Sequence, residues 1–146
     1  MYIRNVIAGF LAPLLLPLSF HIQPVAQRPK ASSALTYSAY VERAFQEKKK
    51  GDLRAAIADY TKAIKLKPDV AETYNGRGLA KYDAGDIRGA IADFSKAIAL
   101  KPDYAEAFRN RANARFFKGD RTGAREDDAR AADLERKQSP KPPPRK

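Results

Sequence analysis

Residues 51–69 read GDLRAAIADYTKAIKLKPD, and residues 85–103 read GDIRGAIADFSKAIALKPD. The two stretches begin 34 residues apart, and 14 of their 19 positions are identical. Most of the remaining positions exchange residues of similar size or polarity. A third and weaker copy begins at Gly119 and continues to Leu134. Self-similarity at a fixed period of this length is typical of repeat proteins, so we predict an array of three units.

Each unit is predicted to consist of two helices joined by a tight Gly-Asp turn. In the middle copy the first helix should span about residues 71–84 and the second about residues 87–100. Glycine tolerates the backbone conformation that ends a helix, and aspartate can cap the amide groups that open the next one. Pro68 and Pro102 close the units, because proline cannot continue a helix but suits the start of a new one.

Small and aromatic residues recur at helical spacing within each unit and indicate one buried face. In the middle copy the motif positions are Tyr74, Gly78, Gly85, Ala90, Phe94, Ala97 and Pro102. Over about residues 37–138 this pattern resembles the tetratricopeptide repeat (TPR) family. The resemblance implies an all-α fold, an α-α superhelix (solenoid) of three helix-turn-helix units of 34 residues. We expect the units at residues 37–70, 71–104 and 105–138.

The third copy departs from the motif on its second helix. Asp128 stands where an aromatic residue belongs, and Arg136 stands where the closing proline belongs. A terminal repeat has no successor to pack against, so its outer face must be compatible with water. We therefore predict that this helix caps the array itself. The alternative is a surface that is completed by a partner or by a second copy of the chain.

Residues 1–26 are predicted to form a signal peptide. Arg4 precedes an uncharged and mostly apolar run over residues 6–20. This run is shorter than the roughly 20 residues that a membrane-spanning helix needs, and two prolines interrupt it. We expect cleavage after Ala26 or Ala34 and export to the periplasm or the medium. The alternative is a short uncleaved segment that anchors the chain in the inner membrane.

The segments that flank the repeats are polar, and the C-terminal one is also rich in proline. Residues 27–36 are predicted to be a linker, and residues 139–146 a basic, Pro-rich tail. The net charge of +11 indicates an anionic partner or surface. The tail is expected either to make weak contact with anionic membrane or cell-wall polymer, or to act only as a solubilising segment.

Residue types that carry catalytic chemistry are scarce. The chain has no cysteine, and its one histidine, His21, lies at the edge of the apolar N-terminal run. The acidic residues follow the helix surface, so no general acid and base can be singled out. We therefore expect a protein that is not an enzyme and has no metal site and no cofactor. Neither a small-molecule substrate nor a specific nucleic acid is expected as a partner.

The TPR resemblance implies that the first helices of successive units line a concave groove that holds a segment of another protein. The groove candidates are Lys48, Lys49, Asn75, Leu79, Tyr82, Arg109, Asn113, Phe116 and Phe117. Aromatic, amide and basic side chains together favour a ligand with an apolar and an acidic part. The alternative is that the aromatic residues only pack between helices and that the lysines are a solvated helix end.

Two functions are therefore expected from the sequence. The first is a non-catalytic protein-protein interaction module, an adaptor that binds a peptide or protein segment in the groove. The alternative is a basic, surface-associating envelope protein that binds polyanions or anionic membrane through its charge excess and its tail.

One specific activity known from the family can be checked position by position. Some TPR proteins hold the C-terminus of a chaperone with Lys, Arg and Asn side chains at five groove positions. The resemblance places these at Val41, Phe45, Gly76, Glu106 and Asn110. Only Asn110 keeps a suitable polar group, and Glu106 has the wrong charge, so binding of a chaperone tail is not expected.

Overall fold

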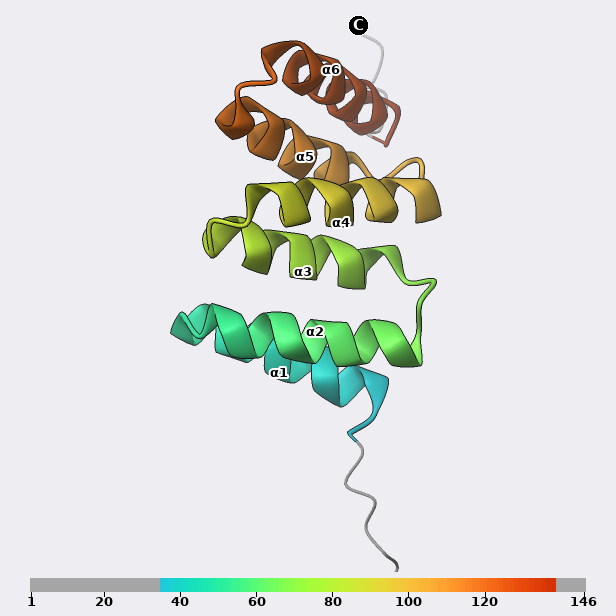
Figure 1. Cartoon of the computed structure of the whole chain (residues 1–146). Coiled ribbons are helices and arrows are strands. Elements are labelled where there is room, and N and C mark those ends of the chain that lie inside the picture. Colours follow the sequence, from blue (N-terminus) through green and yellow to red (C-terminus); the bar gives the residue numbers. More distant parts are fainter. Residues whose placement is uncertain (1–34, 139–146) are drawn as a thin grey trace, which may run out of the picture. The chain divides into compact units, whose positions relative to one another are not determined.

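The computed structural model describes residues 35–138, which form six α-helices and no strand. The helices are α1 (Tyr37–Lys50), α2 (Leu53–Leu66), α3 (Ala71–Asp83), α4 (Ile87–Leu100), α5 (Ala105–Lys118) and α6 (Arg121–Gln138). They stack in chain order (Figure 1), so the predicted all-α solenoid of three helix-turn-helix units is confirmed. The predicted signal peptide and the predicted basic tail lie outside the described residues.

The Gly-Asp turns between paired helices have the predicted geometry. Gly85 is in the left-handed region with φ of 82°, and the amide of Gly89 donates to Asp86 Oδ1 at 2.9 Å. Gly51 and Gly119 also have positive φ values, of 86° and 94°. A side chain is strained in this conformation, which explains why glycine precedes aspartate in all three turns.

The core of each helix pair depends on small residues that let the helices approach closely. Ala90 is fully buried on α4, and Phe94 is 1% exposed. A Cβ atom added at Gly78 of α3 would lie 2.6 Å from the Phe94 ring, so the ring occupies the space that a larger residue would need. Ala114 of the following helix α5 completes this cluster. Gly78, Ala90 and Phe94, three of the motif positions predicted from the sequence, therefore lie in the interior of the array.

Each repeat also contains an ion pair between its two helices in which the aspartate is buried. Arg77 of α3 donates to both carboxylate oxygens of Asp93 in α4, at 2.9 and 2.7 Å, and Arg111 binds Asp127 in the same way at 2.8 and 2.7 Å. Asp93 and Asp127 are 5% and 3% exposed. Because both oxygens are satisfied, the pair fixes the register of the two helices.

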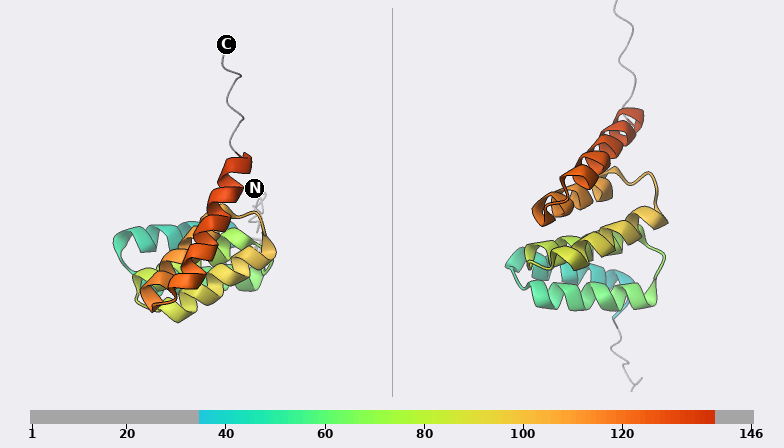
Figure 2. Two further views of the ribbon diagram at one scale, coloured as in Figure 1. Left: turned by 90° about the horizontal axis from the view of Figure 1, so that it is seen from above. Right: turned by 45° about the horizontal axis from the view of Figure 1, so that its top comes forward.

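The first helices of the repeats form one side of the array. Besides the contacts between consecutive helices, α1 touches α3 and α3 touches α5, whereas the second helices make no such contacts with one another in the described range. The first helices are therefore on the inner side. Figure 2 shows that α6 runs obliquely to the earlier helices, as expected of a superhelix. Within residues 35–138, no helix is both long enough and apolar enough to cross a membrane.

Candidate functional site

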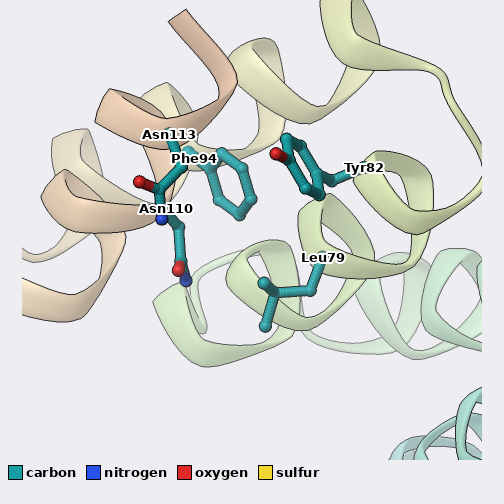
Figure 3. A pocket seen from close by; sticks show the side chains of 5 residues that line it. All are labelled: Leu79, Tyr82, Phe94, Asn110 and Asn113. Carbon is teal, nitrogen blue, oxygen red and sulfur yellow. The ribbon is translucent and has the colours of Figure 1, made fainter. Parts of the chain in front are cut away.

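An open pocket of about 200 Å³ lies between the first helices α3 and α5. It is lined by Leu79, Tyr82, Phe94, Asn110 and Asn113. Figure 3 shows that Leu79 and Tyr82 project from α3 while the two asparagines project from α5, so the pocket bridges two repeats. The structure thus brings together three of the residues predicted for the groove, Leu79, Tyr82 and Asn113.

The pocket combines an apolar floor with polar groups at its mouth. Leu79 and Tyr82 pack against the buried ring of Phe94. The exposed Asn113 amide and the Tyr82 hydroxyl have no hydrogen-bond partner within residues 35–138. An amide and a phenol can donate to and accept from the backbone of a bound segment while the floor accommodates an apolar side chain.

Asn75 differs from its expected place in the groove because it is only 3% exposed. Its Nδ2 donates to the Tyr104 hydroxyl at 3.3 Å and to Glu106 Oε1 at 3.1 Å, and its Oδ1 accepts from Asn110 Nδ2 at 3.0 Å. Burial, followed by the charges of Glu106 and Glu72, raises the pKa of Tyr104 to about 12. Asn75 therefore joins two repeats and orients Asn110, and its own amide is occupied within the protein.

The basic groove candidates are also engaged by the protein itself. Lys48 forms an ion pair with Asp83 at 2.9 Å, and Arg109 Nη2 lies 2.6 and 2.7 Å from the two oxygens of Glu135. Lys49 is exposed and has no ion pair within the described helices. The expectation of free positive charge for an acidic ligand is thus not met at Lys48 and Arg109, because α3 and α6 bring carboxylates beside them.

The aromatic candidates divide into packed and exposed residues. The Tyr82 and Phe117 rings meet edge to face, with centroids 6.3 Å apart. Phe116 and Phe117 are nevertheless 64% and 71% exposed, and Phe45 of α1 is 49% exposed. Packing between helices therefore explains part of the role of Tyr82. Phe116 and Phe117, near the C-terminal end of α5, are too exposed for that interpretation.

Residues at the positions of the chaperone-tail clamp make other contacts within the protein. A Cβ atom at Gly76 would lie 2.8 Å from Tyr60 Cζ, so an asparagine there would require the Tyr60 ring to move. Glu106 is bound by Asn75. The structure therefore offers neither the space nor the charges that such a clamp needs.

Two pocket residues were not among the predicted groove candidates. The repeat pattern places Phe94 in the core, and its ring also forms part of the pocket floor. Asn110 was considered only as a clamp position, although it lies three residues before Asn113 and hence on the same face of α5. That spacing is a sequence signal that could have identified Asn110.

The fold and this inner side define a helical repeat protein of the solenoid class. A sequence profile described as "TPR repeat" matches residues 46–85 and 78–119, which together span just over half of the chain. The chain therefore belongs to the tetratricopeptide repeat family. No curated protein matches it.

Solved structures of TPR proteins resemble the chain over most of its length. The crystal structure of MamA is 27% identical, with a TM-score of 0.70; the match covers 72% of this chain and 61% of MamA. The second TPR of Spaghetti (RPAP3) bound to the HSP90 peptide SRMEEVD is 26% identical, with a TM-score of 0.66, covering 70% of this chain and 94% of that one. The TPR2B domain of yeast Sti1 in complex with pHsp70 is 26% identical, with a TM-score of 0.68, covering 69% and 81%.

Proposed function

We propose that this protein is a non-catalytic adaptor that binds a peptide or protein segment across its inner side, with the pocket between α3 and α5 as the anchor point. The similar domains of Spaghetti and Sti1 that are solved with chaperone peptides support an interaction role. The ligand proposed here is not a chaperone tail, because four of the five clamp positions lack a suitable side chain.

The observation that carries the proposal is the composition of the pocket. Its floor is apolar, and the Asn113 amide and Tyr82 hydroxyl at its mouth have no partner within residues 35–138. A bound segment would place an apolar side chain against Leu79 and the Tyr82 ring, and its backbone would form hydrogen bonds with the Asn113 amide and the Tyr82 hydroxyl. Phe116 and Phe117 would extend the contact, because exposed aromatic residues are typical anchors of interfaces.

A co-purification experiment in the native cell tests the proposal. The full chain should recover a defined protein, and the partner should be lost with Asn113→Asp and reduced with Tyr82→Phe. Both changes keep the shape of the side chain while altering its hydrogen bonding. The matched control is Lys96→Ala, an exposed change on α4. Retention of the partner by both pocket variants would rule out the pocket.

We also propose that the adaptor acts outside the cytoplasm, in the periplasm or the medium, or anchored to the inner membrane. This rests on the apolar run of residues 6–20 and the basic residue before it. Fractionation of cells followed by N-terminal sequencing tests it. A mature N-terminus near Ala26 or Ala34 supports export, an intact N-terminus in the membrane fraction supports the anchor, and an intact cytosolic chain would contradict both.

A second candidate function is binding of anionic membrane or another polyanion. It is favoured by Arg54 and Lys65 on α2 and by Arg88 and Lys96 on α4, which are exposed and have no ion pair within the described residues. The basic tail adds further charge. Binding to heparin or to anionic vesicles should fall steeply with salt and decrease when residues 140–146 are deleted. Binding that is affected neither by salt nor by the deletion would rule this function out.

A further inference from the structure

The third helix pair differs from the second on its exposed side. An open hollow of about 600 Å³ lies between α5 and α6. Its lining consists of Ala112, Asn113, Phe116, Arg121, Ala124, Arg125 and Asp128. Ala112 and Ala124 form its floor, being only 1% and 4% exposed.

The same positions in the second repeat are filled and covered. Counting back 34 residues from the hollow leads to Gly78, Leu79, Tyr82, Ile87, Ala90, Ile91 and Phe94. Six of these seven residues belong to the cluster on which Ala114 of α5 packs. The hollow therefore corresponds to the surface on which the next helix packs in the first two repeats. It has no aromatic ring at the position of Phe94, because Asp128 stands there.

Two of the residues that replace apolar ones are positively charged. Arg121 and Arg125 stand where the second repeat has Ile87 and Ile91. They lie one turn apart on α6, both are exposed, and neither has an ion pair within residues 35–138. The Arg121 guanidinium lies 5.9 Å from the centroid of the Phe116 ring. One aromatic ring, two guanidinium groups without an ion pair in the described range, and the single carboxylate of Asp128 thus border the hollow.

We propose that this hollow binds an acidic amphipathic helix of a partner protein. The surface has the shape for a helix, because its equivalents in the first and second repeats carry α3 and α5. The partner would bring a large apolar side chain into the space that Phe94 fills in the second repeat, beside Phe116. Carboxylates on the same helix would pair with Arg121 and Arg125 in the bidentate manner that guanidinium groups favour.

Two occupants from the chain itself are disfavoured by charge. A second copy in head-to-tail register would place Gln46 where Ala114 packs and would bring the Lys48–Lys50 run of its α1 toward the arginines. The segment 139–146 contains only basic charges and would be repelled as well. An acidic partner is the occupant that complements this surface.

The test measures binding of two synthetic helical peptides of about four turns to the purified full chain by fluorescence anisotropy. One peptide carries glutamates at four-residue spacing around a central phenylalanine, and the other has lysines in their place. The acidic peptide should bind, and Arg121→Glu combined with Arg125→Glu should weaken it at least about tenfold, equivalent to about 1.4 kcal/mol. Both substitutions are at exposed positions, and circular dichroism should show unchanged helicity.

The matched control is Arg54→Glu combined with Arg88→Glu, which changes the net charge equally on α2 and α4. This control and the pocket variant Tyr82→Phe should leave the affinity of the acidic peptide unchanged, because Arg54, Arg88 and Tyr82 do not line the hollow. Three results would overturn the proposal: no binding of the acidic peptide, equal binding of the basic peptide, or equal weakening by both arginine pairs. The last would show a general attraction of polyanions to a basic protein.

Discussion

The second and third repeats share one framework but differ in what they present to their surroundings. Both pair an arginine with a buried aspartate, both turn at Gly-Asp, and both bury an alanine at the helix crossing. Yet Phe94 of the second repeat is 1% exposed beneath α5, whereas its counterpart Asp128 is exposed on α6, the last of the described helices. The comparison separates residues that build a repeat from residues that decide what covers it.

The largest effect is expected when the second repeat carries, at position 94, the aspartate that the third repeat has at the equivalent position. Phe94→Asp should reduce the free energy of unfolding by at least about 4 kcal/mol, because it removes a buried ring and places a carboxylate under α5. Urea denaturation followed by circular dichroism measures the loss. Asp128→Asn is the control and should change stability by less than about 0.5 kcal/mol. Similar losses for both variants would contradict the distinction.

The shared framework should be almost as sensitive. Arg77→Met should cost about 3 kcal/mol of stability, because it leaves the Asp93 carboxylate buried with Lys81 as its remaining ion-pair partner. The exposed Arg88→Met on the neighbouring helix is the control, with an expected change below about 0.5 kcal/mol. If the same denaturation assay found Arg77→Met as stable as this control, the ion pair would not be part of the framework.

The corresponding ion pair in the first repeat, Arg43 with Asp59, should make the free energy of unfolding depend on pH in the acidic range. The hydrogen bond from Arg43, followed by its positive charge, holds the pKa of Asp59 below its usual range. Its contribution is therefore complete above the unfolded pKa of about 4 and is lost as the pH falls below that value. Between about pH 5 and about pH 3, the urea midpoint of Asp59→Asn should fall less than that of the wild type. Equal falls in the two urea midpoints would show that ionisation of Asp59 does not contribute to the pH dependence of stability.

The junction between the second and third repeats offers the smallest effect. The pKa of Tyr104 is raised to about 12, mainly by burial, whereas an unfolded tyrosine ionises near pH 10. The neutral phenol therefore stabilises the fold fully below about pH 10, and this contribution disappears as the pH rises toward 12. Ultraviolet titration of tyrosinate should show a late-ionising group that is absent in Tyr104→Phe. Unchanged titration curves would contradict the burial of this residue.

The sequence predicted the framework well because the framework is repeated. The spacing of Gly85, Ala90 and Phe94 determined the turn, the helix crossing and the core, and helices α3 and α4 end within one residue of their predicted bounds. The buried ion pairs were missed, although arginine and aspartate recur with the same period. Each of them resembles an ordinary surface charge when it is considered alone.

The candidate site was predicted less completely because it depends on contacts between repeats. Leu79, Tyr82 and Asn113 could be assigned to one side from helical periodicity, and the structure places them around one pocket. The burial of Asn75 and the ion pair of Arg109 with Glu135 depend on how α5 and α6 are rotated against their neighbours. A linear pattern contains no information about such rotations.

The most direct test of the central claim is site-specific photo-crosslinking of the full-length protein in its native cell. A photoreactive phenylalanine analogue in place of Phe117, whose ring meets Tyr82 of the pocket, should crosslink to one defined protein. The same analogue at Ala92, an exposed position on α4, should not. We expect a single partner that is specific to position 117, whereas no product at either position, or the same products at both, would contradict binding at the pocket.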